Sequence, residues 1–167
     1  MTDIEIDKAL IDILAEKKQA CEARLAAIPK ENKTEKKALH LELGMYTLCQ
    51  NAGLLINTTG GREGVLRTRR AVIAQVLSKN PTLLAGFEAL EDEDQKKWIA
   101  GWQAELFLRD QFLPQYREAL RAAEDAADTD GILEMRIKLG TVESVFNAWQ
   151  AWRREHNVFP HVAEAIK

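Results

Sequence analysis

The sequence predicts an all-α fold: a helical bundle of about six to eight helices with a long N-terminal antiparallel αα-hairpin and no sheet. Apolar residues recur at steps of three and four residues in several long segments, which is the period of helices that bury one side. No segment alternates apolar and polar residues between tight turns, as β-hairpins do. We therefore expect a single all-helical domain over 1–167, with a possible division into a hairpin over 1–56 and a bundle over 57–167.

The predicted N-terminal hairpin joins a helix over 3–28 to a second helix that ends near Ile56. Asp3 can cap the first helix, and Pro29 ends it because proline cannot continue a helix. The charged connection that follows is short, so the two helices are expected to be antiparallel. Their predicted core stripes are Ile4, Ile11, Leu14, Cys21, Leu25 and Ile28 in the first helix, and Ala38, Leu41, Met45, Leu48, Ala52 and Leu55 in the second.

A polar, Gly-rich joint over 57–61 separates this hairpin from the rest of the chain, because its residues favour a turn. A third helix is expected after it, ending near Lys79, and it carries the main basic segment of the chain. Free N–H groups at the helix start could hold a phosphate or carboxylate together with the arginines, so a small ligand near Gly60–Arg70 is a possibility. Neither glycine-rich nucleotide-binding motif is present. The candidate anion-binding or partner-binding residues are Arg62, Arg67, Arg69 and Arg70.

Two further helices are predicted between the basic segment and Pro114. Asn80 and Pro81 are typical of the start of a short helix. An acidic run then opens a longer, strongly apolar helix, where carboxylates suit the positive end of the helix dipole. Pro114 is expected to break or kink that helix. The acidic-surface candidates are Glu91, Asp92, Glu93 and Asp94.

The last two predicted helices flank a turn at 128–131. The first of them carries small residues that allow close packing, and the second, about 131–156, has the most regular apolar stripe of the chain. That stripe consists of Ile132, Met135, Leu139, Val142, Phe146 and Trp149. Its tryptophans are expected in the core. If they were exposed, Trp149, Trp152 and Arg153 would form an aromatic hot spot for binding.

Composition is ordinary for a globular protein, but charge is unevenly distributed. The 167 residues carry a net charge of −3. Segment 57–87 has five basic residues and one acidic residue, whereas 88–134 has thirteen acidic and five basic residues. The N-terminus lacks a secretory signal pattern and no apolar run is long enough for a membrane span, so we expect no membrane association. Two cysteines without an export signal suggest the cytoplasm.

The motifs of catalysis and metal binding are missing from the sequence. Neither Glu-x-x-His nor HExxH occurs, and we predict no metal, no cofactor and no catalytic residues. An aspartate-rich turn resembles part of a calcium loop, but Ile137 stands where that loop requires a carboxylate. Cys21 and Cys49 are expected to be buried free thiols. The hairpin register separates them by about 12 Å, too far for a disulfide.

These observations favour a non-catalytic protein-binding module: an adaptor, assembly component or inhibitor that acts through helical surfaces. The partner is expected to be another protein, a second copy of the chain in a homo-oligomer, or both. The alternative is a nucleic-acid-associated protein that uses the basic segment 62–70, or an acidic surface that imitates nucleic acid. A sequence pI of about 5.7 does not favour nucleic acid as the partner.

Overall fold

The computed structural model describes residues 1–58 and 61–158, and within them the side chains outside 52–58, 62 and 102–107. The described residues form seven α-helices and one π-helical segment, and no strand. The elements are α1 (Asp3–Ala27), α2 (Lys33–Thr58), α3 (Gly61–Leu77), α4 (Pro81–Glu88), α5 (Asp92–Glu105), η1 (Leu106–Phe112), α6 (Leu113–Asp125) and α7 (Thr129–Glu155). The all-helical prediction is therefore confirmed.

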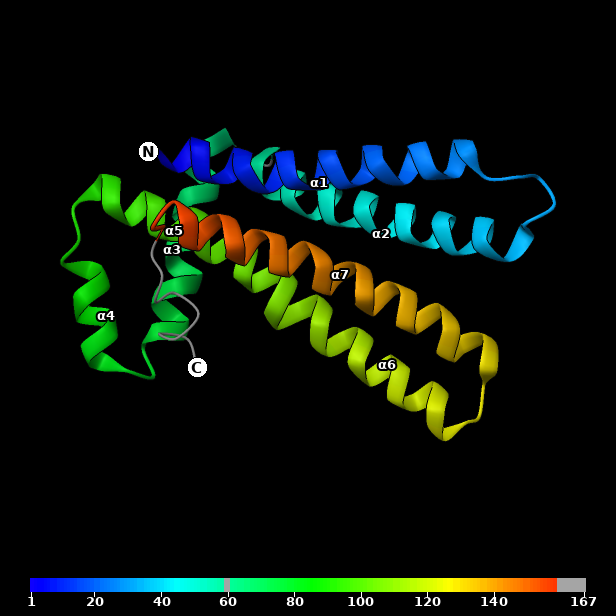
Figure 1. Cartoon of the computed structure of the whole chain (residues 1–167). Helices are drawn as coiled ribbons and strands as arrows, with labels where there is room; N and C mark the ends of the chain where they lie inside the picture. Colours follow the sequence, from blue (N-terminus) through cyan, green and yellow to red (C-terminus); the bar gives the residue numbers. More distant parts are fainter. Residues whose placement is uncertain (59–60, 159–167) are drawn as a thin grey trace.

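Two long hairpins dominate the molecule (Figure 1). The α1/α2 hairpin lies along the α6/α7 hairpin, and α3, α4 and α5 gather at the end that holds the N-terminus. The turns that close the two hairpins both lie at the opposite end, where the hairpins diverge. The two helices of the first hairpin contact each other through a hydrogen bond from Cys21 Sγ to the carbonyl oxygen of Leu39, at 3.4 Å.

One core joins the two hairpins. Its fully buried side chains come from the first hairpin and from α7 alike, with Ile6, Leu14 and Cys21 on one side and Val142 and Trp149 on the other. A second, smaller cluster fills the space between α3, α4 and α5, and consists of Leu66, Ile73, Leu77, Phe87 and Ile99. The division of the chain at residue 56 stays a prediction, but the main core draws on both sides of it.

Two of the three predicted core stripes need correction. Ile4 and Ile11 are exposed, and α1 buries Ile6 and Ala9 instead, because this helix packs against α5 and α7 as well as against α2. In α2, Leu48 is 41% exposed. Met45 is buried as predicted, and the buried face is rotated so that it also includes Leu39, Tyr46 and Cys49. The predicted Ala52 and Leu55 side chains lie outside the described residues. In α7 the predicted stripe is confirmed from Met135 to Trp149, whose members are buried or packed against the core, whereas Ile132 is half-buried outside that cluster.

The helix caps agree with the sequence with one exception. Asn80 caps α4, accepting a hydrogen bond from the Leu83 N–H at 3.3 Å. The α1 cap is Thr2 rather than Asp3, because Thr2 and Glu5 complete a capping box. Gly61 begins α3 with a φ of +74°, a left-handed conformation that glycine adopts readily, as expected for the joint.

Pro114 does not end the fifth helix. The chain runs from α5 through η1 into α6 without a loop, and Pro114 stands in the first turn of α6. Proline lacks an N–H and crowds the carbonyl four residues before it, so an α-helical bond cannot form there. The wider π-helical turns of η1 supply the change of hydrogen bonding immediately before this point. Residues 161–167, where the sequence allows a last short turn of helix, lie outside the described residues.

Candidate functional site

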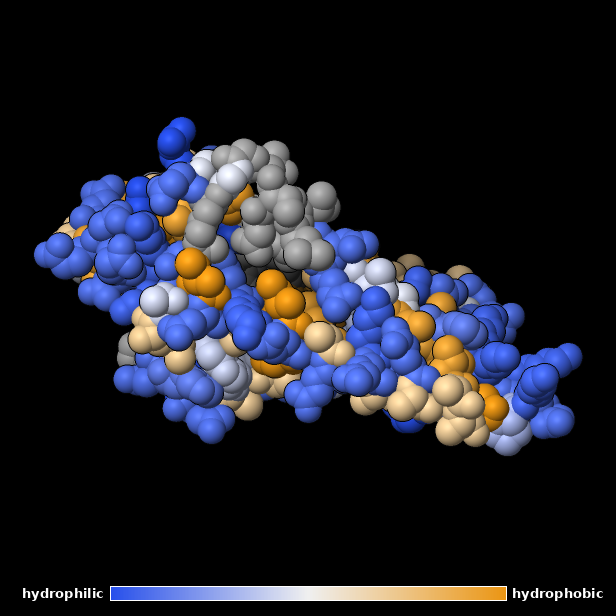
Figure 2. Space-filling model, turned by 90° about the horizontal axis from the view of Figure 1, so that it is seen from above, coloured by the Kyte–Doolittle hydropathy of each residue, from blue (hydrophilic) through white to orange (hydrophobic). Residues whose placement is uncertain are grey.

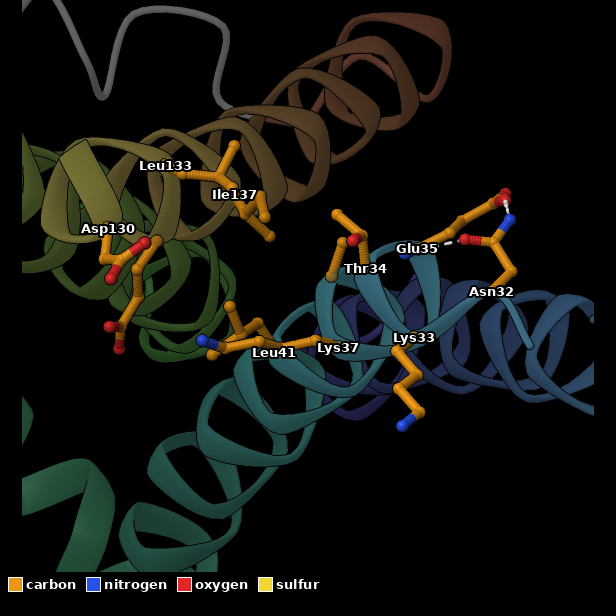
Figure 3. A pocket seen from close by; sticks show the side chains of 11 residues that line it. Asn32, Lys33, Thr34, Glu35, Lys37, Leu41, Asp130, Leu133 and Ile137 are labelled. Atoms are coloured by element: carbon orange, nitrogen blue, oxygen red, sulfur yellow. Dashed lines mark hydrogen bonds between the residues drawn. The ribbon is translucent and has the colours of Figure 1, made fainter. Parts of the chain in front are cut away.

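A cleft opens between the tips of the two hairpins, where α2 and α7 begin (Figure 3). We call it the tip cleft; its volume is about 490 Å³. Helix α2 supplies one wall and α7 the other, and both helices start at this end of the molecule. The lining residues are Asn32, Lys33, Thr34, Glu35, Lys37, Ala38 and Leu41 from the α2 side, and Asp130, Leu133, Glu134 and Ile137 from α7.

Side-chain caps fix the beginning of each wall. Asn32 Oδ1 accepts a hydrogen bond from the Glu35 N–H at 3.3 Å, and its amide nitrogen donates to Glu35 Oε2 at 2.7 Å. Asp128 caps α7 by accepting a bond from the Gly131 N–H at 3.1 Å. Such caps satisfy backbone groups that the helix itself leaves unpaired, so both walls are well-defined helical surfaces up to the tips.

The floor of the tip cleft is apolar. Leu41 and Ile137 face the gap from opposite helices (Figure 3), and Ala38 and Leu133 add to it. Leu133 is 53% exposed, one of the most exposed large apolar side chains among those described. On each wall the apolar residues are three or four positions apart, so each forms a short row along its helix. Two such rows make a groove that accepts the ridge of a third helix.

The two walls carry opposite charge. The α2 wall has Lys33 and Lys37 with Glu35 between them, and the α7 wall has Asp130 and Glu134. Glu134 bonds Lys138 of its own helix at 2.8 Å. No ion pair among the described side chains crosses the tip cleft. Lys33, Lys37 and Asp130 form no ion pair with another described side chain, so their charge remains available to a molecule that enters, whereas Lys138 partly neutralises Glu134.

The basic segment of α3 is largely used inside the molecule. Arg69 is 5% exposed and pairs with Asp7 of α1, with 3.5 Å between Nη1 and Oδ1. Arg70 pairs with Asp92 of α5, with 3.2 Å between Nη2 and Oδ1. Arg67 is exposed, and the Arg62 side chain lies outside the described residues. The three described arginine side chains thus do not form one open basic surface.

The acidic run at the start of α5 is partly neutralised by neighbouring lysines. Lys96 reaches Asp92 at 3.1 Å and Glu93 at 3.3 Å, and these hydrogen bonds raise the pKa of Lys96. Asp94 lies 3.7 Å from a lysine on the same helix, and Glu91 is exposed. Arg70 of the basic segment forms an ion pair with Asp92 of the acidic run. Part of the uneven charge distribution therefore serves to hold α3 against α5.

The aromatic hot spot is not exposed as that hypothesis requires. Trp149 is completely buried, and Arg153 is 3% exposed. Trp152 is half-buried, stacked on Trp149 with ring centroids 5.4 Å apart and on His156 with centroids 4.4 Å apart. The two tryptophans therefore serve mainly as core, which was the expectation for them.

The two cysteines are buried free thiols, as predicted. Burial raises the pKa of Cys49 to about 12, and burial also raises the pKa of Cys21. Both side chains are therefore protonated near neutral pH, the unreactive form of a thiol. Among the described residues, no three His, Cys, Asp or Glu side chains come together in a way that could hold a metal ion.

Comparison of the chain with protein-family models, with curated proteins and with solved structures gives no match. None of the helices that the structure describes is long and apolar enough to cross a membrane.

The tip cleft was not recognisable as a site from the sequence. Ala38 and Leu41 belong to the predicted core stripe of α2, but they line an opening. Leu133 and Ile137 form a second apolar row beside the main stripe of α7. Apolar residues outside the main stripe of a helix were the sequence feature that could have indicated this cleft. Sequence periodicity gives the face of a helix but not the divergence of two hairpins, which is a property of the assembled core.

Proposed function

We propose that this chain is a non-catalytic protein-binding module, an adaptor, assembly component or inhibitor, that docks a helical segment of a protein in the tip cleft. The observation that carries the proposal is the pair of apolar rows on α2 and α7, which lie open between capped helix starts. A groove of this kind suits an amphipathic helix with apolar residues at steps of three and four. We expect the protein to act in the cytoplasm, since its two thiols are free.

The charges on the walls define the chemistry of the docked helix. It would carry acidic residues on the side that meets Lys33 and Lys37, and basic residues on the side that meets Asp130 and Glu134. These contacts would set the direction of the helix in the groove, and the apolar floor would supply most of the affinity.

The nucleic-acid alternative has less support. Phosphate binding needs several accessible cationic side chains on one surface. Arg69 is buried against Asp7 and Arg70 pairs with Asp92, so two of the four candidate arginines are engaged by carboxylates of the same chain.

Position-specific photo-crosslinking in native cell extract tests the proposal. A benzophenone amino acid replaces Leu133 in one protein and Leu48 in another; Leu48 is also an exposed leucine but does not line the tip cleft. We expect a discrete protein to become attached at position 133 and not at 48. The attached protein is then identified and purified, and its Kd is measured with Leu133→Glu and with Leu48→Glu.

The expected loss of affinity follows from the exposure of Leu133. Full burial of a leucine side chain contributes about 1.5–3 kcal/mol, and 53% of this side chain is still exposed. Docking can therefore gain about 1 kcal/mol from Leu133, and the glutamate adds a desolvation cost, so Kd should rise by about tenfold. An equal effect of Leu48→Glu, or no protein attached at position 133, would reject the proposal.

A further inference from the structure

We propose that the occupant of the tip cleft is the tip of a second copy of this chain, so that two molecules form a symmetric dimer cleft to cleft. This inference rests on the proposed function, because it names the protein that the docking surface binds. It follows from the way charge is divided between the two walls, with lysines on α2 and carboxylates on α7.

Two-fold symmetry allows two ways for such clefts to meet. In one, each wall meets the same wall of the other copy, so Lys33 and Lys37 would face their own equivalents and the acidic walls would also face each other. In the other, the second copy is turned so that the α2 wall of each molecule meets the α7 wall of its partner. Only the second arrangement places unlike charges together at both contacts.

Symmetry also doubles the effect of each contact. A two-fold interface repeats every pair, so lysines of one copy meet carboxylates of the other twice. The exposed Leu133 and the apolar floor of each cleft would be covered at the same time by the partner's tip. A single chain thus holds both halves of a complementary surface.

The same unlike charges could instead draw the two hairpins of one molecule together. That closure would leave the protein monomeric, so the oligomeric state of the purified full chain separates the two cases. Sedimentation equilibrium measures it directly, and we expect a dimer.

Charge reversal on each wall gives the decisive test. The variant Lys33→Glu/Lys37→Glu makes both walls acidic, and Asp130→Lys/Glu134→Lys makes both walls basic. Each should dissociate the homodimer, with a rise in the dimer dissociation constant of about tenfold or more, because every reversed contact occurs twice. An equimolar mixture of the two variants should form a heterodimer, since unlike walls then meet again.

Controls keep a negative result interpretable. Lys79→Glu reverses an exposed lysine after α3, outside the tip cleft, and should leave the dimer intact. Circular dichroism establishes that each variant is folded, and Leu133→Gln is a second route to the monomer that leaves the charge of both walls unchanged. Raising salt from about 0.1 M to about 1 M shortens the Debye length from about 10 Å to about 3 Å, so the charge-reversal effects should shrink.

A monomeric wild-type protein, or a dimer that neither reversal affects, overturns this inference. A mixture of the reversed variants that stays monomeric also overturns it. If the purified chain is monomeric while position 133 still captures a different protein, the dimer is wrong and the proposed function stands. If position 133 captures nothing, both are wrong.

Discussion

The buried ion pair between Arg69 and Asp7 predicts that this arginine stabilises the fold. Their Nη1 and Oδ1 atoms are 3.5 Å apart, and the two side chains are 5% and 12% exposed. At an effective dielectric constant of about 20, this separation corresponds to an attraction of about 5 kcal/mol. Desolvation of both groups offsets much of that attraction, so the pair adds little net stability, but removing one partner deprives the other buried charge of this attraction.

We therefore expect Arg69→Met to lower the free energy of unfolding by about 3–5 kcal/mol. Urea unfolding, followed by circular dichroism and extrapolated to water, measures the change. The double variant Arg69→Met/Asp7→Leu should recover most of the loss, because it removes both buried charges together. Arg67→Met is the matched control on the same helix: Arg67 is exposed, and its replacement should change stability by no more than about 0.5 kcal/mol.

The reasoning fails if Arg69→Met costs less than about 1 kcal/mol, or if the double variant is as unstable as the sum of the single changes. The first result would mean that Arg69 is not a structural residue and would restore it as a candidate for binding an anion. The second would mean that Arg69 does not stabilise the fold through Asp7.

Four other outcomes follow from burial and capping. Cys21 and Cys49 should react with a thiol reagent such as DTNB only when the protein is unfolded, and fast labelling of the native protein would contradict their burial. Because burial raises the pKa of Cys49 from 9.0 to about 12, its thiol stabilises the folded state fully below pH 9. That contribution is lost as pH rises toward 12, so a Cys49→Ala variant should show a smaller decline of stability over this range. Trp149→Ala should lower the free energy of unfolding by about 3–5 kcal/mol, since it leaves a cavity in the core, and a loss below about 1 kcal/mol would refute its central position. Asn80→Ala removes the cap of α4 and should cost about 1 kcal/mol in urea titrations, whereas no change would show that the cap hydrogen bond adds nothing.

Sequence periodicity was sufficient for the fold class and for most helix boundaries, since these depend on local features. The start of α4 at Asn80 and Pro81 could be predicted, and so could the apolar stripe of α7, because each depends only on residues of its own helix. The buried face of α1 was not, because Ile4 and Ile6 are both apolar and only the packing of α5 and α7 selects one of them. Long-range packing also decided how α2 is rotated, leaving Leu48 at the surface.

The candidate site was less accessible to sequence reasoning than the fold. Charge runs were visible, but whether Arg70 and Asp92 serve a partner or each other depends on the crossing of α3 and α5. Arg69 did fall among the apolar residues of α3 in the sequence, and its burial is consistent with that position. The tip cleft arises where two hairpins diverge, which no local pattern encodes.

The π-helical segment between α5 and α6 has a consequence for chain length. A π-helical turn holds more residues than an α-helical one, so Leu106–Phe112 stores surplus backbone within an otherwise α-helical run. A single deletion there can be absorbed by tightening the coil to α-helical geometry, whereas the same deletion inside α7 would rotate every later side chain by about 100°. Natural variation in the number of residues should therefore be tolerated at this segment and rejected within α7.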